Sequence, residues 1–152
     1  MKLIASRFLV KGLFAVAVTF AGSSLVLGET IAVIGTGNVG GALGPRFATL
    51  GHNIIYGSRE PDRQDVQALV TKTGHNATAM LPAAAAAEAD IVVMATKWAQ
   101  AEVALKSLGD LAGKIVLDPN NPVRVDSAGK RYHDVDTSAG QMIQDWVPDA
   151  MV

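Results

Sequence analysis

The chain has 152 residues, with 13 basic and 14 acidic side chains and a formal net charge of −1. This length predicts one domain with a core of its own, and the balanced charge gives no sign of nucleic acid or of a strongly acidic partner. The sequence contains no cysteine, which excludes disulfides, thiolate catalysis and cysteine metal sites.

The first 28 residues have the order of an export signal. Three basic residues fall within the first eleven positions, residues 12–21 are almost wholly apolar, and small residues follow. We therefore predict a signal peptide over residues 1–28 and an exported domain, periplasmic or secreted, over residues 29–152. Two alternatives stay open: an uncleaved membrane anchor, or a cytoplasmic protein whose start codon is assigned too early. The apolar stretch is short for a membrane span, so no stable span is expected after cleavage.

Short apolar runs alternate with helical patterns along the rest of the chain. The apolar runs are continuous, as is typical of strands covered on both faces. Strands are predicted at residues 31–34, 53–56, 91–96 and 114–117, with a weaker strand at 77–80. Helices are predicted at residues 39–50, 64–73, 82–89 and 100–108. This order indicates an α/β fold: a Rossmann-like, doubly wound parallel sheet in three α/β/α layers.

A glycine-rich turn follows the first predicted strand and fits the pattern G-x-G-x-x-G. Its residues are Gly35, Thr36, Gly37, Asn38, Val39 and Gly40. In this pattern the first glycine makes the tight turn, the second admits a pyrophosphate against the backbone, and the third lets helix and strand pack closely. The open N–H groups at the helix start then meet the phosphate. We predict a dinucleotide-binding site; the alternative is a tight turn alone.

The residues after the second predicted strand indicate which dinucleotide binds. NAD sites normally place Asp or Glu there to accept a hydrogen bond from the ribose 2′-hydroxyl. This chain has Ser58 and Arg59 instead, and the next carboxylate is Glu60. A hydroxyl and a guanidinium suit a 2′-phosphate through charge-assisted hydrogen bonds. The pattern therefore favours NADP(H); the alternative is that Arg59 is a surface residue in a polar turn.

Four stretches together resemble the NADP oxidoreductase family that depends on the deazaflavin coenzyme F420: IAVIGTGNVGGALG, YGSRE, IVVMAT and VLDPNNP. The resemblance extends over residues 30–152. It implies a Rossmann fold in which Thr36, Ser58 and Arg59 hold the adenosine 2′-phosphate. It also implies that the turn after the fourth strand, Thr96, Lys97 and Trp98, lines the nicotinamide side with Asn121 and Pro122. Such domains are similar to the NADPH-binding parts of membrane ferric reductases and of imino-acid reductases such as pyrroline-5-carboxylate reductase.

Two features depart from the family pattern. Lys97 and Trp98 stand where such domains usually have a small apolar residue and proline, so a cation and a large ring are expected near the nicotinamide. Trp98 as a core or edge residue, and residues 120–122 as a simple turn, are the alternatives. The family also continues past a sixth strand, and this sequence ends at about the place where that strand would begin. The C-terminal strand is therefore expected to be incomplete, with the residues that complete the deazaflavin side missing.

Hydride transfer between two cofactor rings needs no protein acid or base, so no catalytic residue is assigned. The three histidines lack ligand-like spacing, and no metal site is predicted. The leading hypothesis is an NADPH-dependent oxidoreductase that moves hydride between NADP and a deazaflavin, a flavin or a similar planar electron carrier. A non-catalytic or partner-dependent NADP-binding module is the main alternative, followed by an imino-acid or ferric reductase. A homodimer would cap an unfinished sheet edge.

Overall fold

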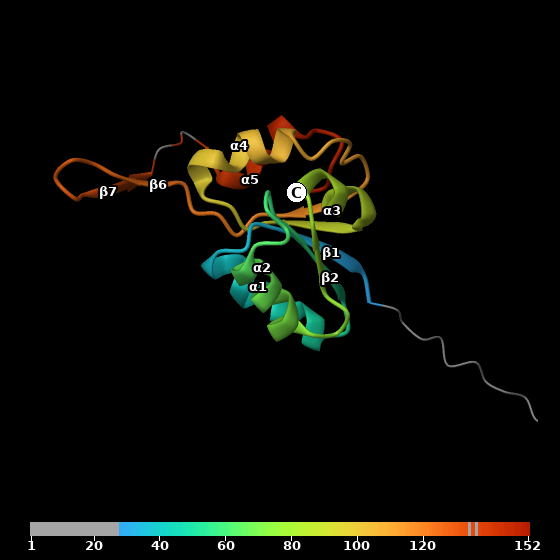
Figure 1. The fold of residues 1–152 in the computed structure, drawn as a ribbon. Helices are drawn as coiled ribbons and strands as arrows, with labels where there is room; N and C mark the ends of the chain where they lie inside the picture. The colour runs from blue at the N-terminus through green and yellow to red at the C-terminus, as the bar shows by residue number, and fades with distance from the viewer. Residues whose placement is uncertain (1–27, 134, 136) are drawn as a thin grey trace, which may run out of the picture.

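The computed structural model describes residues 28–133, 135 and 137–152. One five-stranded parallel sheet lies between two layers of helices (Figure 1), which confirms the predicted doubly wound α/β fold. Residues 1–27 of the predicted signal peptide lie outside the described residues, so that prediction is untested. Within the described part of the chain, no helix combines the length and the hydropathy needed to cross a bilayer.

The sheet has the strand order β3-β2-β1-β4-β5, and every neighbouring pair is parallel. Its strands are β1 (Thr30–Ile34), β2 (Asn53–Gly57), β3 (Thr78–Met80), β4 (Ile91–Met94) and β5 (Ile115–Leu117). The chain builds outward from β1 to β3 and then crosses to β4 on the other side of β1. In open α/β sheets, ligands bind outside the carboxyl ends of the strands at such a switch point.

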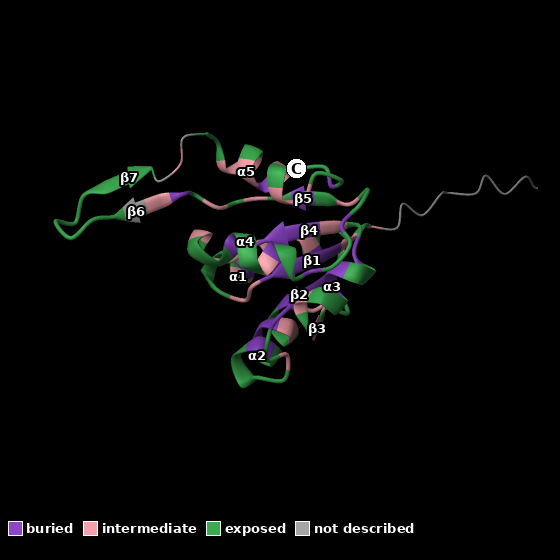
Figure 2. Cartoon of the chain, turned by 90° about the horizontal axis from the view of Figure 1, so that it is seen from above, coloured by how far each residue is buried: buried purple, intermediate pink, exposed green. Residues whose placement is uncertain are grey.

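The helices are divided between the two faces of the sheet (Figure 1). Helices α1 (Asn38–Thr49) and α2 (Gln64–Thr73) cover one face, and α3 (Pro82–Glu88), α4 (Trp98–Lys106) and α5 (Ala139–Trp146) cover the other. Successive β1 residues contribute to different cores: Ile31 and Val33 to one, Ala32 and Ile34 to the other. Because both faces are buried (Figure 2), the strands read as continuous apolar runs.

Helix α3 lies very close to the sheet because its inner residues are small. Ala85 and Ala86 are fully buried against it. A Cβ atom on Gly57 would lie 2.6 Å from the Ile34 Cδ1 atom and 3.2 Å from the Cα atom of Pro82. Alanine and glycine at these positions therefore let helix and strand approach, as expected from the alanine-rich sequence.

The predicted elements are present, with two differences around β4. The predicted strand 91–96 ends at Met94, because the amide of Ala95 turns back to the carbonyl oxygen of Val93 at 3.0 Å. The helix predicted from residue 100 begins at Trp98, so α4 starts directly after the turn. This brings the start of α4 close to the carboxyl edge of the sheet.

Three elements were not predicted: the two strands of a hairpin and one helix. A β-hairpin of β6 (Val123–Val125) and β7 (Arg131–His133) projects from the body of the domain (Figures 1 and 2). Helix α5 follows it and is capped by the Ser138 hydroxyl, which accepts a hydrogen bond from the Gln141 amide at 3.1 Å. After α5, Met151 forms a single parallel bridge with Ile115 on β5, where the sixth strand was predicted to begin.

Candidate cofactor-binding site

The three glycines of the turn after β1 have different surroundings. Gly35 has a φ of +108°, and a Cβ atom there would lie 2.5 Å from the Ala95 carbonyl oxygen. A Cβ atom on Gly40 would overlap the carbonyl oxygen of Gly35. Gly37 has an ordinary φ of −76°, and no described atom comes within 4 Å of its added Cβ. Protein packing thus accounts for the first and third glycines, whereas the space beside Gly37 is open to a ligand.

Helix α1 begins beside this open space. Its N-cap residue is Gly37, which has no side chain to cap the helix, and its first turn carries no acidic residue. The first N–H groups of a helix have no partner within it, and the helix dipole favours an anion there. Thr36 is half-buried, and Asn38 and Val39 are exposed around the same turn. The arrangement fits a pyrophosphate.

The end of β2 is held beside α1 by a buried tyrosine. The Tyr56 hydroxyl donates to Thr73 Oγ1 at 2.7 Å, because Thr73 Oγ1 itself donates to the Leu69 carbonyl at 2.8 Å. A Cβ atom on Gly44 of α1 would overlap the Tyr56 hydroxyl. Burial raises the pKa of Tyr56 above its usual value, although the hydrogen bond to Thr73 opposes this shift. The neutral phenol thus links β2, α1 and α2.

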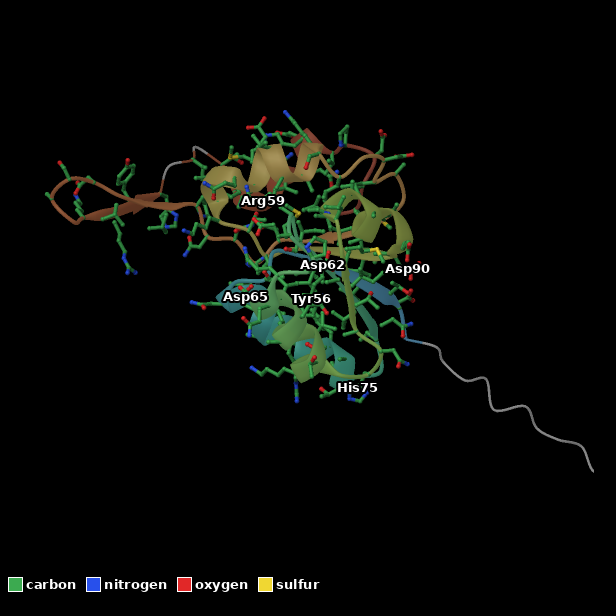
Figure 3. All side chains as sticks on the ribbon, viewed as in Figure 1. Tyr56, Arg59, Asp62, Asp65, His75 and Asp90 are labelled. Atoms are coloured by element: carbon green, nitrogen blue, oxygen red, sulfur yellow. The ribbon has the colours of Figure 1, made fainter. Side chains whose placement is uncertain are left out.

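Ser58 and Arg59 follow β2 directly. The Ser58 side chain is buried, its amide donates to the Met80 carbonyl at 3.0 Å, and its Oγ atom accepts from the Glu60 amide at 3.2 Å. Arg59 is exposed, and no carboxylate of the described residues pairs with it. Figure 3 labels it on the segment after β2. Ser58 is therefore fixed, while the Arg59 guanidinium is free to meet an anion.

The turn after β4 brings Thr96, Lys97 and Trp98 to the same edge of the sheet. The Oγ1 atom of Thr96 is buried and has no hydrogen-bond partner among the described residues. Lys97 is exposed at the start of α4. The Trp98 ring is tilted by 31° against Trp146 of α5, with 5.5 Å between ring centroids. Trp98 packs on the core, which was one of the two predictions for it, and it also lines a cleft; its contact with a nicotinamide stays a prediction.

Asn120 ties the ends of β4 and β5 together, a role that the sequence analysis missed. Its Nδ2 atom donates to the Met94 carbonyl at 3.0 Å and to Asp118 Oδ1 at 2.7 Å. Because both partners are acceptors, the amide must point its nitrogen at them, which leaves Oδ1 turned away. Asn121 next to it is exposed, whereas Pro122 is buried.

A cleft of about 470 Å³ lies between the start of α1, the start of α4 and the segment after β5. Its lining residues are Val39, Lys97, Trp98, Ala99, Pro119, Asn120, Asn121 and Val123. The cleft therefore unites Lys97, Trp98 and Asn121 with Val39 of the glycine-rich turn. Pro122 lies outside it, and Ser58 and Arg59 lie at the end of β2, across β1 from β4.

All predicted site residues thus follow the carboxyl ends of four adjacent strands. Going along this edge, Arg59 follows β2, the glycine-rich turn follows β1, Lys97 follows β4 and Asn121 follows β5. A dinucleotide could extend along the edge with its phosphates at the centre. Among the described residues there is no group of three or more His, Cys, Asp or Glu side chains that could hold a metal ion.

Residues 30–122 match the family described as NADP oxidoreductase, coenzyme F420-dependent. A candidate F420-dependent NADP-reductase from Arthrobacter sp. FB24 has 33% identity and a TM-score of 0.72, over 81% of this chain and 60% of that chain. A hypothetical protein from Sinorhizobium meliloti, SMa0349, has 27% identity and a TM-score of 0.64, over 80% of this chain and 58% of that chain. The imine reductase BcSIRED from Bacillus cereus shares the fold, with 21% identity and a TM-score of 0.54, over 80% of this chain and 38% of that chain.

The parallel sheet and its glycine-rich turn define a Rossmann-type nucleotide-binding domain. Because the family match extends over residues 30–122, more than half of the chain, the chain belongs to the NADP oxidoreductase, coenzyme F420-dependent family. Membership supports NADP(H) as the cofactor. The chain spans about three fifths of the length of the Arthrobacter and Sinorhizobium proteins.

Proposed function

We propose that the chain binds NADP(H) along the carboxyl edge of its sheet and works as an NADPH-dependent oxidoreductase. Gly37 carries this proposal. Neither its φ of −76° nor its packing requires glycine, because no described atom lies within 4 Å of an added Cβ. Glycine is also a favourable N-cap residue. The reason that we favour is a ligand that approaches the backbone closely, and a pyrophosphate at a helix start is such a ligand.

In this proposal the adenosine 2′-phosphate lies at the end of β2. The Arg59 guanidinium lacks an ion-pair partner among the described residues and would bind the phosphate. The Ser58 Oγ atom accepts a hydrogen bond from the Glu60 amide, and its hydroxyl would donate a hydrogen bond to a phosphate oxygen. Thr36 lies in the glycine-rich turn nearby. No carboxylate precedes Glu60 after β2, so a 2′-phosphate would meet little repulsion.

The nicotinamide would lie in the cleft beyond the glycine-rich turn. Asn120 offers its Oδ1 atom as an acceptor there, since its Nδ2 atom is held by Met94 and Asp118. Trp98 supplies a flat wall and excludes water from that side. When bound, NADPH would transfer a hydride from C4 of its dihydronicotinamide, with two electrons, to the acceptor, and a proton from water would balance the reduction.

The acceptor that we favour is a deazaflavin or a similar planar electron carrier, because the matching family is described as coenzyme F420-dependent. The protein would position the two rings rather than supply an acid or base. An imino-acid or ferric reductase is a less favoured proposal. Export and homodimer formation remain predictions from the sequence.

A second candidate function is NADP binding without independent turnover. The edge of β5 favours it: among the described residues, Met151 alone pairs there, through one bridge to Ile115. A cleft of about 500 Å³ lies along the same edge and includes Val116, Leu117 and Val152. A partner or a further strand would complete this side of the sheet, and with it the second-substrate site.

Energy transfer from tryptophan to NADPH tests the proposed function. The chain has two tryptophans: Trp98 lines the cleft in which the nicotinamide would sit, and the Trp146 ring packs against Trp98 with 5.5 Å between ring centroids. Excitation of tryptophan should therefore produce nicotinamide emission when NADPH is added. NADPH oxidation on addition of F420 would then support the oxidoreductase, whereas emission without turnover would favour the binding module. Absence of nicotinamide emission would contradict both.

A further inference from the structure

We propose that the open edge of β5 is the interface for a second copy of this chain, and that the β6–β7 hairpin of each copy lies on that edge of the other. This inference goes beyond the proposed function, because it names an interaction surface and the partner that fits it. Three observations support it: a strip of exposed apolar side chains at the edge, a hairpin that projects from the domain, and opposite charges on the two surfaces.

The β5 edge exposes four large apolar side chains, which we call the edge strip. Ile115 and Leu117 are 39% and 41% exposed, and Met151 and Val152 are 54% and 44% exposed. Val116 is buried in the core beneath α3, α4 and α5, so Ile115 and Leu117 point to the opposite face of the sheet. Helices α1 and α2 on that face pack on β1, β2 and β3. An exposed apolar strip on an edge strand favours association with another chain.

The hairpin projects away from the body of the domain (Figures 1 and 2). Val125 of β6 is 61% exposed. In the antiparallel ladder Val125 lies directly opposite Arg131 of β7, so both side chains are on one face of the hairpin. A two-stranded hairpin alone is at best marginally stable in water. This face therefore offers an apolar residue and a cation, side by side, to a surface that would cover it.

The hairpin is basic. Lys130 and Arg131 are exposed, and no carboxylate of the described residues forms an ion pair with either of them. Asp126 holds the turn, because its Oδ1 atom accepts the amides of Ala128 and Lys130, each at 2.9 Å. The sequence after Arg131 has four aspartates and no lysine or arginine. Basic and acidic residues are thus separated along this part of the chain.

The amino end of β5 is acidic. The Gly113 amide donates to the Asp149 carbonyl at 3.0 Å, which places Asp149 beside the start of β5, and Asp110 precedes the turn that leads into this strand. Both aspartates are exposed, and neither forms an ion pair among the described residues. Lys114 is directed elsewhere, because its Nζ atom donates to the Ala89 carbonyl at 2.6 Å, at the end of α3.

Twofold symmetry brings these surfaces together. Most homo-oligomers use a twofold axis, and the same patch then contributes from both copies. With the axis across the strands, the carboxyl end of one β5 lies beside the amino end of the other. The basic hairpin follows the carboxyl end, and Asp110 and Asp149 lie at the amino end. Each hairpin therefore meets the aspartates of the other copy while the two edge strips cover one another, and the complementary charges fix the orientation.

Cysteine pairs test this contact, because the sequence has no cysteine that could form another disulfide. The full chain with Ala128→Cys is mixed with the full chain with Pro148→Cys under mild oxidation, and linked peptides are identified by mass spectrometry. Both positions are exposed and leave the charged residues intact. We expect a disulfide between positions 128 and 148. It should not form when Thr71→Cys on α2, beside β3 at the opposite edge of the sheet, replaces Ala128→Cys. Absence of the 128–148 disulfide would contradict the inference.

Charge reversal assigns the contact to the hairpin and the aspartates. Lys130→Glu with Arg131→Glu should raise the dissociation constant of the dimer, measured by sedimentation of the full chain, on the order of tenfold, because attraction becomes repulsion. Asp110→Lys with Asp149→Lys in the same chain should restore the native value. Lys72→Glu on α2 is the control and should change nothing. A monomer at every concentration, a dimer that the reversal does not weaken, or a fourfold variant that stays weak would contradict the inference.

Discussion

The carbonyl oxygen of Gly35 lies where a Cβ atom on Gly40 would have to be placed. The start of α1 can therefore pack against the end of β1 only when residue 40 has no side chain. This close contact sets the direction in which α1 leaves the sheet, and so the position of its open N–H groups.

Gly40→Ala should destabilise the fold by about 1–3 kcal/mol, because backbone atoms must move to relieve the overlap. Gly41→Ala is the matched control. Its Cβ would meet only the Leu69 Cδ1 atom, at the ordinary distance of 3.9 Å, and alanine favours a helix by up to about 1 kcal/mol over glycine. Urea denaturation measures both. Equal stabilities for the two variants would contradict the packing role of Gly40.

Gly37→Ala should separate binding from stability. Its Cβ would enter open space at an ordinary φ, so the free energy of unfolding should change by less than about 1 kcal/mol. The same methyl group would lie where the pyrophosphate approaches, so NADPH affinity should fall on the order of tenfold. Urea denaturation and a fluorescence titration on one preparation check both parts. Unchanged NADPH binding would remove the main support for the proposed site.

Local sequence signals were sufficient for most of the sheet and for the glycine-rich turn. The apolar runs are buried on both faces, and the three glycines lie within residues 35–40, so both patterns are visible without tertiary information. Helix α5 was missed although Ser138 and Gln141 form the S-x-x-Q capping pattern, a signal that could have found it. The strands of the hairpin have three residues each and lack an apolar run.

The features that the sequence did not reveal depend on contacts between segments that are far apart in the chain. Asn120 acts through the Met94 carbonyl, 26 residues away, and nothing in its own neighbourhood of the sequence indicates that partner. Trp98 is held by Trp146, on a helix that was not predicted. Lys97 and Trp98 were predicted to lie near a nicotinamide, and that prediction is untested. The neutral residues that surround Lys97 in the cleft come together only when the chain is folded.

Asn120→Ala should destabilise the protein by about 1–3 kcal/mol, because the Met94 carbonyl loses its side-chain donor and Asp118 Oδ1 keeps only the backbone amide of residue 120. The loss would also free the segment after β5, so the tryptophan-sensitised emission of NADPH should weaken. Asn121→Ala is the control: its side chain is exposed, and stability should change by less than about 0.5 kcal/mol. If both variants unfold at the same urea concentration, Asn120 does not tie β4 to β5.

The raised pKa of Tyr56 predicts that the folded protein loses stability at alkaline pH. Burial raises the pKa of the folded phenol above the usual value of 10.0, so the unfolded chain loses its proton first as the pH rises. The contribution of this phenol to the free energy of unfolding is complete below pH 10, and it declines as the pH rises from there through the pKa of the folded state. Urea denaturation across this range should show a decline that Tyr56→Phe reduces.

The same substitution has an effect at neutral pH. Tyr56→Phe removes the hydrogen bond to Thr73 and should cost about 0.5–1.5 kcal/mol, while Thr73 keeps its bond to the Leu69 carbonyl. An alkaline decline as steep in Tyr56→Phe as in the native chain would show that another group causes it.

Calorimetric titration of the full chain with NADPH and with NADH tests the central claim most directly. Tight NADPH binding that NADH does not match is expected, because Arg59 has no ion-pair partner among the described residues and the Ser58 hydroxyl, which accepts from the Glu60 amide, can still donate to a 2′-phosphate. Arg59→Ala should lower NADPH affinity about ten- to a hundredfold, the value of one charge-assisted hydrogen bond. Arg46→Ala, at the far end of α1, should bind as the native chain does. Equal affinities for the two dinucleotides, or an Arg59→Ala variant that binds NADPH normally, would contradict the account.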